Sequence, residues 1–589
     1  MLAPRTRWRF PEPVSLDDGL LEAARRRGLG IRVTALLAGR GVTDATALEA
    51  FLGEARDGLH DPALLPDAAA FGARIGAARE RGERILAFGD FDADGLTGLA
   101  IMTLALRRLG VEVLPYVPSR LDEGHGLSHA AVEAAAAAGA SLIVTVDTGT
   151  SSATEVAAAN ERGIDVLVTD HHRVPAVRPP ALAVVNPHRL DSAYPDRRLA
   201  GSGVAFTLAR LLLGDAALAL ADLAAIGTVA DLAPVLGENR AIVRLGLERL
   251  RAEPRPGLRA LLAAARIERT DVDLETLAFG VAPRLNAAGR VGEASDAAPL
   301  LLAEDPIEAE RLAAALETAN ATRRELMKAA IAEARTSPDA IAAAAATIVR
   351  GPWPVGIVGL VASRLVEERG RPAVIGADLG SVIRASCRSD GRVHLGDALA
   401  ACEDLLLRHG GHAGAAGFEI EADRWAAFRD RFLELVAQGE VVDRGPESIV
   451  DVVVPALGVD YGLQRDLARL APCGIGNPAP LVAVLGLEVT RVREANGGHT
   501  TLVLRRDRDV LDGVAFGWPE LAREVSPGDR IDVVAALRSR RFGGFESLQL
   551  EIRDAAPSGL HPEARMILQG PLAVGPGAPV GAARPATVG

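Results

Sequence analysis

ILAFGDFDADG, residues 85–95, sets the fold, because an apolar run that fits a buried strand passes directly into three aspartates spaced two apart. SLIVTVD (141–147) and DVLVTD (165–170) repeat this pattern, and VEVLPYV (111–117) is a further apolar run. Residues 97–109 have the spacing of a helix. Strands that alternate with helices predict an α/β protein, with a parallel sheet and helices on both of its faces.

Acidic and imidazole side chains gather where three of these runs end. They are Asp90, Asp92, Asp94, Asp147, Asp170, His171 and His172, and a further candidate, Asp231, stands in TVADLAP. Residues two apart on an extended segment point the same way, and parallel sheets bind ligands at the carboxyl ends of their strands. Carboxylates brought together there repel one another unless cations bind among them.

The ligand types indicate which cations these would be. Mixed carboxylate and imidazole ligands suit Mn²⁺, and carboxylates alone suit Mg²⁺. Two such ions can activate a water and stabilise an in-line phosphoryl displacement. The sequence therefore predicts a site for two divalent metal ions, Mn²⁺ or Mg²⁺, that hydrolyses phosphate esters.

Each motif also has an ordinary structural explanation. Asp-x-Asp-x-Asp-Gly occurs in calcium loops, but such a loop needs Glu at its twelfth position, where this chain has Ile101, and a helix before it, where this chain has a strand. Asp147-Thr148-Gly149 or Asp170-His171-His172 alone would be a turn or a surface histidine pair. Their position at successive strand ends favours the metal site.

The bulk composition constrains the class of protein. A net charge of −12 argues against a protein that coats nucleic acid by bulk electrostatics, although it is compatible with a local basic groove. Three cysteines fit neither a zinc motif nor a complete disulfide framework, which favours a reducing compartment. Neither a signal peptide nor a membrane span is predicted, so we expect a cytoplasmic protein.

At 589 residues the chain is long enough for about three or four domains. We expect an N-terminal helical segment, a catalytic domain, a connecting helix that begins at Asp305, a second α/β domain, a small β-barrel and a disordered tail. Their boundaries in that order are 1–80, 81–300, 301–340, 341–440, 448–556 and 557–589.

GDFDADG, VDTG, TDHH and TVADLAP, in that order, resemble the motifs of the DHH phosphoesterase superfamily. YVPSRLDEGHGLS (116–128), RLNAAGR (284–290), VGIVGLVASRL (355–365), GGHAGAAG (410–417) and PCGIGNPAP (472–480) resemble segments of the RecJ nucleases within it. The resemblance implies a DHH domain, a long helix, a DHHA1 domain and an oligonucleotide-binding (OB) barrel. It also implies a 5′-to-3′ exonuclease specific for single-stranded DNA, which releases 5′-mononucleotides in recombination and repair.

The resemblance also implies the roles of individual residues. The expected metal ligands are Asp90, Asp92, Asp147, His171 and Asp231, with Asp94 and His172 as either further ligands or their supports. Some relatives have a ligand histidine four residues before the first aspartate, where this chain has Leu86. One of the two metal sites is therefore expected to have fewer ligands.

DNA contacts are expected in three places. Arg120, Ser386 and Arg388 form a 5′-phosphate pocket by resemblance, and Arg290 would touch the strand that enters the site. Glycines around Gly411 and His412 leave backbone amides free to approach phosphates. In the barrel, Arg541 and Phe542 combine charge with an aromatic ring, as single-strand binding requires, although a plain hairpin turn has the same composition.

Two other functions are compatible with parts of the sequence. A DHH phosphodiesterase for short RNA or cyclic dinucleotides would share the acidic motifs, but such proteins are generally shorter and have no barrel. A single-stranded-DNA-binding scaffold without metals would share the barrel, but here every acidic motif is intact. The expected partners are single-stranded DNA, a single-strand-binding protein and a helicase, with no membrane and a monomeric state.

Overall fold

The computed structural model describes residues 2–120, 122–291, 296–337, 345–391, 393–438, 446–542 and 545–569, with the backbone alone at 541 and 542. The contacts divide the chain into two compact units. The first unit, here called the catalytic unit, comprises Leu59–Val442, and the barrel unit joins Met1–Gly58 to Asp443–Pro585.

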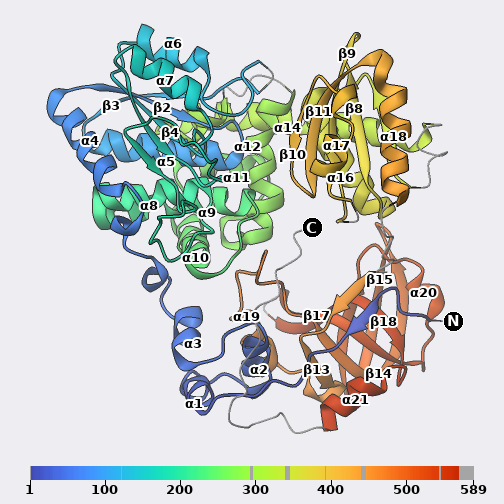
Figure 1. Ribbon diagram of the computed structural model, residues 1–589. Helices are drawn as coiled ribbons and strands as arrows, with labels where there is room; N and C mark the ends of the chain where they lie inside the picture. Colours follow the sequence, from blue (N-terminus) through green and yellow to red (C-terminus); the bar gives the residue numbers. More distant parts are fainter. Residues whose placement is uncertain are drawn as a thin grey trace. The chain divides into compact units, whose positions relative to one another are not determined.

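A parallel sheet of five strands forms the first half of the catalytic unit (Figure 1). The strand order is β3 (Glu112–Tyr116), β2 (Arg84–Gly89), β4 (Leu142–Val146), β5 (Asp165–Thr169) and β6 (Ala183–Val185). Alternate residues of β4 belong to different cores, because Leu142 and Val144 pack on one face and Ile143 packs on the other. The expected parallel sheet is confirmed.

Helices cover both faces of this sheet, as the sequence predicts. On one face lie α4 (Ala68–Arg81), α5 (Ala93–Arg108), α8 (Gly201–Leu213) and α9 (Ala221–Ala230), and on the other lie α6 (His129–Ala137) and α7 (Ala153–Glu161). The first core is extended by α10 (Gly237–Ala252), α11 (Pro256–Ala264), α12 (Ala282–Val291) and α13 (Ala297–Leu302).

Residues 201–230 have the length and apolar composition of a membrane span. They consist of α8 and α9 with a 3₁₀ segment, η3 (Gly214–Leu220), between them. Both helices contribute fully buried side chains, such as Phe206 and Ile226, to the core beside the sheet. Their apolar character therefore has a structural explanation in this core.

A helix of 31 residues, α14 (Pro306–Thr336), connects this half to a second sheet. Asp305 caps it by accepting a hydrogen bond from the N–H of Ile307 (3.2 Å), which confirms the predicted N-cap. Leu312 and Leu316 of α14 pack in the core of the parallel sheet, whereas Ala330 and Ala334 pack in a core of the second sheet. One rigid helix thus spans both cores.

The second sheet is mixed and has the order β10 (Arg408–Gly411), β11 (Ala415–Glu421), β9 (Val382–Arg388), β8 (Ala373–Asp378) and β7 (Thr347–Gly351). Only β7 and β8 pair in parallel among these described strands. Helix α16 (Val355–Arg369) packs on one face together with α14, and α17 (Leu395–Ala400) and α18 (Trp425–Gln438) pack on the other.

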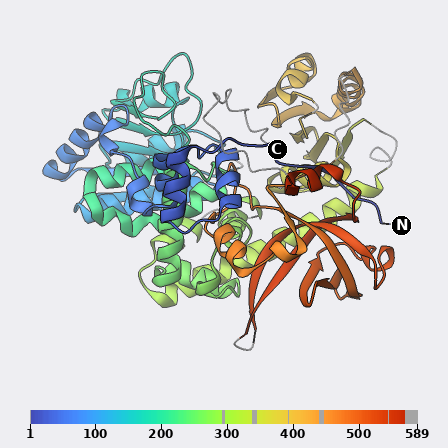
Figure 2. The ribbon, with the colours of Figure 1, turned by 90° about the horizontal axis from the view of Figure 1, so that it is seen from below.

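The barrel unit is built on a closed sheet (Figure 2). The order is β13 (Val452–Pro455), β14 (Val482–Ala495), β15 (His499–Arg506), β16 (Asp509–Ala515), β18 (Phe545–Pro557) and β17 (Arg530–Phe542), and the barrel closes because β14 also pairs with β17. Four short helices pack against it: α1 (Asp18–Arg26), α2 (Ile31–Gly39), α3 (Ala45–Leu52) and α19 (Tyr461–Ala468). Another helix, α20 (Leu521–Glu524), follows β16.

The N-terminus is held to the barrel by hydrogen bonds. β1 (Arg7–Arg9) pairs in parallel with β12 (Glu447–Ile449). The buried carboxylate of Asp554 accepts hydrogen bonds from the N–H groups of Arg5 and Thr6 and from the indole N–H of Trp8, each 2.9 Å long.

The structure corrects two expected boundaries. The predicted N-terminal segment 1–80 is divided, because residues up to 58 belong to the barrel unit while Phe71 and Ile75 of α4 pack beside the parallel sheet. The tail predicted to be disordered over 557–589 contains α21 (Pro562–Gln569). The apolar residues of α21 recur at helical spacing, so that one face packs beside Trp8. Residues 570–589 lie outside the described part.

Candidate metal centre and phosphate pocket

The first acidic motif is divided between a strand end and a helix start. Asp92 is the N-cap of α5, and its carboxylate accepts hydrogen bonds from the N–H groups of Asp94 (3.0 Å) and Gly95 (3.1 Å). The helix therefore begins at Ala93, four residues before the predicted start. Asp94 lies in its first turn and does not continue the extended segment, which corrects the reading of the three aspartates as one strand end.

Asp94 is buried and bonded to the backbone of a neighbouring helix. Its two oxygens accept hydrogen bonds from the N–H groups of Gly201 (2.7 Å) and Ser202 (2.9 Å), at the start of α8. A helix N-terminus leaves such N–H groups without partners in the helix, and a carboxylate satisfies them. Asp94 thereby ties α8 to α5 beneath the acidic loop.

Asp147 and His171 meet at the carboxyl edge of the sheet. His171 Nε2 lies 3.0 Å from Asp147 Oδ1, and both side chains are largely buried. Asp147 has a positive φ of 61°, an uncommon conformation that Asn, Asp and Gly adopt more readily than other residues. A Cβ at Gly201 would lie 2.4 Å from Asp147 Oδ1, so only glycine leaves room for this carboxylate.

His171 also links the remaining predicted ligands. Its Nε2 lies 3.9 Å from Asp94 Oδ2, and its Nδ1 lies 3.8 Å from Asp231 Oδ2, at the C-cap of α9. Three overlapping groups of possible ligand atoms result, within each of which the atoms lie within 4.8 Å of one another. They are Asp90, Asp92 and Asp147; Asp147, His171 and His172; and Asp94, His171 and Asp231.

The electrostatics of this cluster show an excess of negative charge. Burial, followed by the charges of neighbouring aspartates, raises the pKa of Asp92 and raises that of Asp147 well above the ordinary range. Burial and the charge of Asp94 raise the pKa of Asp231 to about 7. Asp90 Oδ1 and Asp147 Oδ1 are buried and accept no well-aligned hydrogen bond from the described residues, although His171 Nε2 lies 3.0 Å from Asp147 Oδ1. Unpartnered carboxylate oxygens beside an imidazole are a donor set that fits divalent cations.

A cluster of arginines lies beside the acidic cluster. Arg120, in the loop after β3, lies over the ring of Phe91 at 4.4 Å and is close enough to Asp90 and Asp92 for their charges to affect its pKa. Burial, then the charges of Arg120 and other arginines, lowers the pKa of Arg290 to about 9. Arg290 donates a hydrogen bond from Nη1 to the carbonyl of Gly356 (3.1 Å), while its Nε is buried with no partner among the described residues.

Arg388 and Ser386 complete this cationic cluster from β9. Arg388 Nη1 donates to Ser386 Oγ (3.0 Å), and both side chains lie close to Gly359 of α16, where a Cβ would be 3.1 Å from Ser386 Oγ and 3.2 Å from Arg388 Nη2. Burial lowers the pKa of Arg388. A half-buried cation beside the first turns of a helix has the chemistry that suits a phosphate.

The comparisons with known proteins follow this division of the chain. Residues 84–228 match the N-terminal domain of the DHH family, residues 340–438 match the DHHA1 domain, and residues 450–554 match the RecJ OB domain. The single-stranded-DNA-specific exonuclease RecJ of Bacillus subtilis (strain 168) is 36% identical over 566 residues, which cover 95% of this chain and 72% of that relative. The chain belongs to the RecJ family.

Other RecJ proteins extend the comparison. RecJ of Dickeya dadantii (strain 3937) is 38% identical over 80% of this chain and 88% of its own length. The crystal structure of RecJ from Thermus thermophilus in complex with Mn²⁺ matches 94% of this chain and 80% of its own with a TM-score of 0.78 and 32% identity. The family and the domain order implied by the sequence motifs are confirmed.

Two other residues predicted to contact DNA lie at the end of the edge strand of the second sheet. Gly411 ends β10, and its register partner Ala416 pairs in turn with Cys387, the residue between Ser386 and Arg388. His412 follows and is exposed. Arg541 and Phe542 stand at the end of β17 in the hairpin with β18. Their side chains lie outside the described residues.

Sequence reasoning missed two residues that organise this RecJ-family site, His125 and Asn286, and gave Asp170 no specific role. His125 Nδ1 lies 3.1 Å from Asp90 Oδ2, and Asn286 Oδ1 accepts a hydrogen bond from the N–H of Ala93 (2.7 Å) at the start of α5. Both residues stand in quoted motifs, EGHGLS and RLNAAGR, but their partners are distant in sequence. Asp170 accepts hydrogen bonds from the N–H of His171 (2.7 Å) and from His172 Nδ1 (2.8 Å).

Asp170 and His172 each shift the pKa of the other. Burial alone would raise the pKa of Asp170, but hydrogen bonds from His172 and Thr150 and the charge of His172 lower it below its ordinary range. The hydrogen bond to Asp170 raises the pKa of His172 to about 9. His172 is thus held by Asp170 at the end of β5, next to His171.

Proposed function

We propose that this RecJ-family chain degrades single-stranded DNA from its 5′ end and releases 5′-mononucleotides. The observation that carries the proposal is the juxtaposition of two uncompensated clusters in one unit. Carboxylates in excess lie beside half-buried arginines in excess, and Arg120 is close to both. A substrate with a scissile phosphate next to a terminal phosphate fits this pairing, because cations with the first cluster and arginines with the second each neutralise one phosphate.

Asp90, Asp92, Asp147, His171 and Asp231 would hold two divalent metal ions, Mn²⁺ or Mg²⁺. When bound, these ions supply Lewis-acid activation of the attacking water and charge stabilisation at the scissile phosphate. Asp94 acts from behind them by fixing the N-terminus of α8, next to Asp147. Asp170 holds His172, which stands beside His171 as a further donor or as its support.

Arg120, Arg290, Arg388 and Ser386 would bind the 5′-terminal phosphate. A terminal phosphate carries more charge than an internal diester, and guanidinium groups donate paired hydrogen bonds to it. Because the pocket adjoins the acidic cluster, a bound terminal phosphate sets the bond that is cut. With the 5′-terminal phosphate held there, each cut would release one nucleotide.

Other parts of the strand would contact the glycine-rich edge strand and, separately, the OB domain. Exposed backbone at Gly411 and the side chain of His412 would contact internal phosphates. Arg541 and Phe542 of the OB domain would add charge and base stacking. In this division of the chain, the DHH domain spans 81–300, the DHHA1 domain 341–440 and the OB domain 448–556.

The cellular setting belongs to the same proposal. The RecJ relatives are named for single-stranded DNA, and we assign this chain the same substrate, in DNA recombination and repair in the cytoplasm. A monomer that receives single strands from a helicase and from a single-strand-binding protein would complete the pathway.

Digestion of end-labelled oligonucleotides tests the proposal. With Mn²⁺, a 5′-labelled single strand should release labelled mononucleotide from the first time point, while a 3′-labelled strand should give a series of shortened products. A blunt duplex of the same sequence and a reaction with EDTA are the controls, and both should stay intact. Mononucleotide released first from the 3′ end, or internal cuts in a circular single strand, would contradict the proposal.

A further inference from the structure

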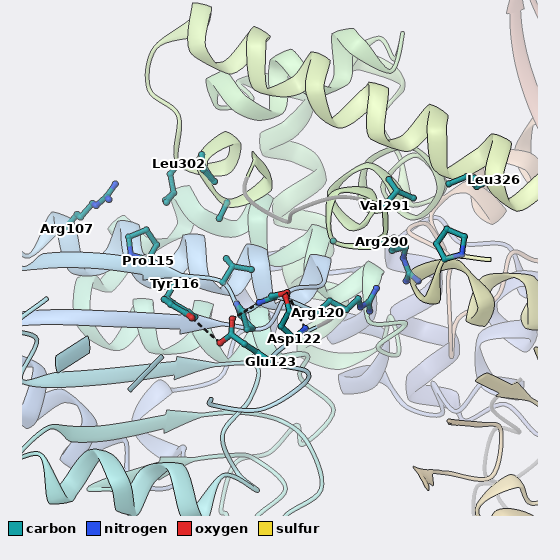
Figure 3. Close-up of a pocket in the computed structure, with 17 residues that line it drawn as sticks. Arg107, Pro115, Tyr116, Arg120, Asp122, Glu123, Arg290, Val291, Leu302 and Leu326 are labelled. Atoms are coloured by element: carbon teal, nitrogen blue, oxygen red, sulfur yellow. Dashed lines mark hydrogen bonds between the residues drawn. The ribbon is translucent and has the colours of Figure 1, made fainter. Parts of the chain in front are cut away.

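A cavity of about 960 Å³ lies beside the proposed phosphate pocket, between the edge of the parallel sheet and helices α12 to α14 (Figure 3). The end of β3 forms one wall, with Tyr116, and α13 forms another, with Leu302. Figure 3 shows Arg107 at one end of the cavity and Arg120 and Arg290 toward the other. The cavity therefore begins at two arginines of the cationic cluster.

The walls of this cavity are largely apolar. Proline, valine and leucine side chains from the sheet edge and from three helices line it, among them Pro115, Val117, Leu302 and Leu326. Apolar walls bind flat heterocycles through burial and do not distinguish one base edge from another. Such a lining suits a nuclease that must accept every base.

Several uncharged donors in the lining bond to neighbouring carboxylates. Tyr116 donates its hydroxyl hydrogen to Glu123 (3.0 Å), and the N–H of Ser119 donates to the same carboxylate (2.8 Å). The hydroxyl of Ser119 donates to Asp122 (2.6 Å). Figure 3 shows this network at the cavity wall. Because these donors are already used, they do not select a particular base.

We propose that the cavity receives the base of the 5′-terminal nucleotide, and that it accepts bases enlarged by bulky apolar groups. This inference rests on the proposed function, since Arg120 and Arg290 hold the terminal phosphate at the cavity's inner end. Pockets for ligands of drug size measure roughly 300–1,000 Å³, and this one is near the upper limit. A single base leaves much of that space free, so the enzyme removes strand ends that carry large base lesions.

A terminal pyrene nucleotide is the probe. The substrates are two 5′-phosphorylated oligothymidylates, one with an ordinary terminal nucleotide and one in which pyrene replaces the terminal base. The wild-type chain should cleave both with kcat/KM values within about threefold of each other. In EDTA, where cleavage stops, the vibronic bands of bound pyrene should report an apolar environment.

Cavity-filling variants separate this cavity from a general apolar surface. Leu302→Trp and Leu326→Trp narrow it from two different helices, and overfilling of this kind costs enough to lower kcat/KM on the pyrene-ended strand by about tenfold or more. Their activity on the ordinary strand should fall clearly less than their activity on the pyrene-ended strand, because a single base needs less of the cavity. Ile267→Trp is the matched control, because it places the same side chain in a separate cavity of about 410 Å³, and it should change neither activity.

The outcomes distinguish the two proposals. If the wild type digests the ordinary strand but not the pyrene-ended one, the cavity inference is overturned and the nuclease assignment stands. Equal losses on both strands in Leu302→Trp and Leu326→Trp, or pyrene emission typical of water, also overturn it. If neither strand is digested from the 5′ end, the proposed function itself fails, and the inference fails with it.

Discussion

The acidic cluster and the cationic cluster of the catalytic unit are built in different ways. The acidic residues stand mostly at the strand ends of one parallel sheet, so that a single domain assembles them. Some cationic residues come from the loop after β3 and from α12, which packs beside the parallel sheet. The others come from β9 of the second sheet. Two contacts bring these residues together: α14 packs in the cores of both sheets, and Arg290 of α12 bonds to Gly356 of α16. Under the proposed function, hydrolysis would depend on one sheet, and recognition of the strand end would depend on how two sheets are joined.

Loss of one carboxylate from the acidic cluster should have the largest effect. In Asp147→Asn the shape is kept and the positive φ is tolerated, but a proposed metal ligand is lost. We expect kcat/KM to fall by roughly 10³-fold or more in Mn²⁺, while single strands still bind in EDTA. Because the substitution removes a buried charge from an acidic excess, the metal-free variant should unfold at the wild-type temperature or above it. Near-wild-type cleavage would remove Asp147 from the metal centre.

Loss of one arginine from the cationic cluster should lower kcat/KM on 5′-phosphorylated strands only. Arg388→Ala removes a charged hydrogen-bond donor beside Ser386, and the expected loss is roughly 10- to 100-fold in kcat/KM on 5′-phosphorylated strands. Strands with a 5′-hydroxyl should change by less than about threefold. Arg384→Ala is a matched control, because Arg384 lies on the same face of β9 but pairs with Glu419. Equal losses on both ends would exclude Arg388 from the phosphate pocket.

A smaller effect is expected at the boundary between the clusters. His125 is bonded to one oxygen of Asp90, which leaves the other oxygen, Oδ1, free for a cation. Removing such a supporting hydrogen bond in His125→Ala should weaken Mn²⁺ binding by about tenfold, as measured by titration with electron paramagnetic resonance. His125→Asn places a donor near the position of Nδ1 and should restore much of the affinity. His129→Ala, nearby and exposed, should bind Mn²⁺ as the wild type does.

If His125→Ala binds Mn²⁺ normally, the contact with Asp90 is incidental. If it loses affinity but His125→Asn does not recover it, the imidazole acts through something other than the Nδ1 donor. The two variants therefore test whether the hydrogen bond from residue 125 positions the Asp90 carboxylate, and not only whether a side chain is present there.

The sequence predicts the acidic cluster better than the cationic one for a physical reason. Strand ends in a parallel sheet are brought together by topology, so Asp90, Asp147 and His171 could be grouped from the pattern of apolar runs. The role of Asp94 could not be deduced in this way, because it depends on a helix that starts at the cap Asp92 and on the approach of α8. Family motifs, and not spacing, pointed to Arg388.

The same limit applies to the division of the chain. Residues 1–58 pack on a barrel that begins about 390 residues later, and local patterns contain no information about that partner. The helix α21 was missed because its residues are few and its packing partner, Trp8, lies at the other end of the chain. Contacts within one supersecondary unit were predictable, and contacts between distant segments were not.

Glu238 is a buried carboxylate outside both clusters. Its substitution should change only the pH dependence of the free energy of unfolding, which is the smallest of the expected effects. Glu238 is fully buried and accepts hydrogen bonds from the hydroxyl of Tyr194 (2.6 Å) and the N–H of His60 (3.1 Å). Burial raises its pKa from 4.5 to about 7. Between these two values the folded chain keeps a proton that the unfolded chain has released, so the free energy of unfolding falls as pH rises through this window.

Glu238→Gln removes this titration while keeping the shape of the side chain. From pH 5 to pH 8 the wild type should lose up to about 3 kcal/mol more than the variant, since each pKa unit corresponds to about 1.4 kcal/mol. Urea unfolding followed by tryptophan fluorescence at several pH values measures the difference, and cleavage by the variant should stay close to wild type. Parallel pH profiles would show that Glu238 is ionised in the fold. A sharp loss of cleavage would show that this carboxylate supports the site, and that the acidic cluster extends further than its strand ends.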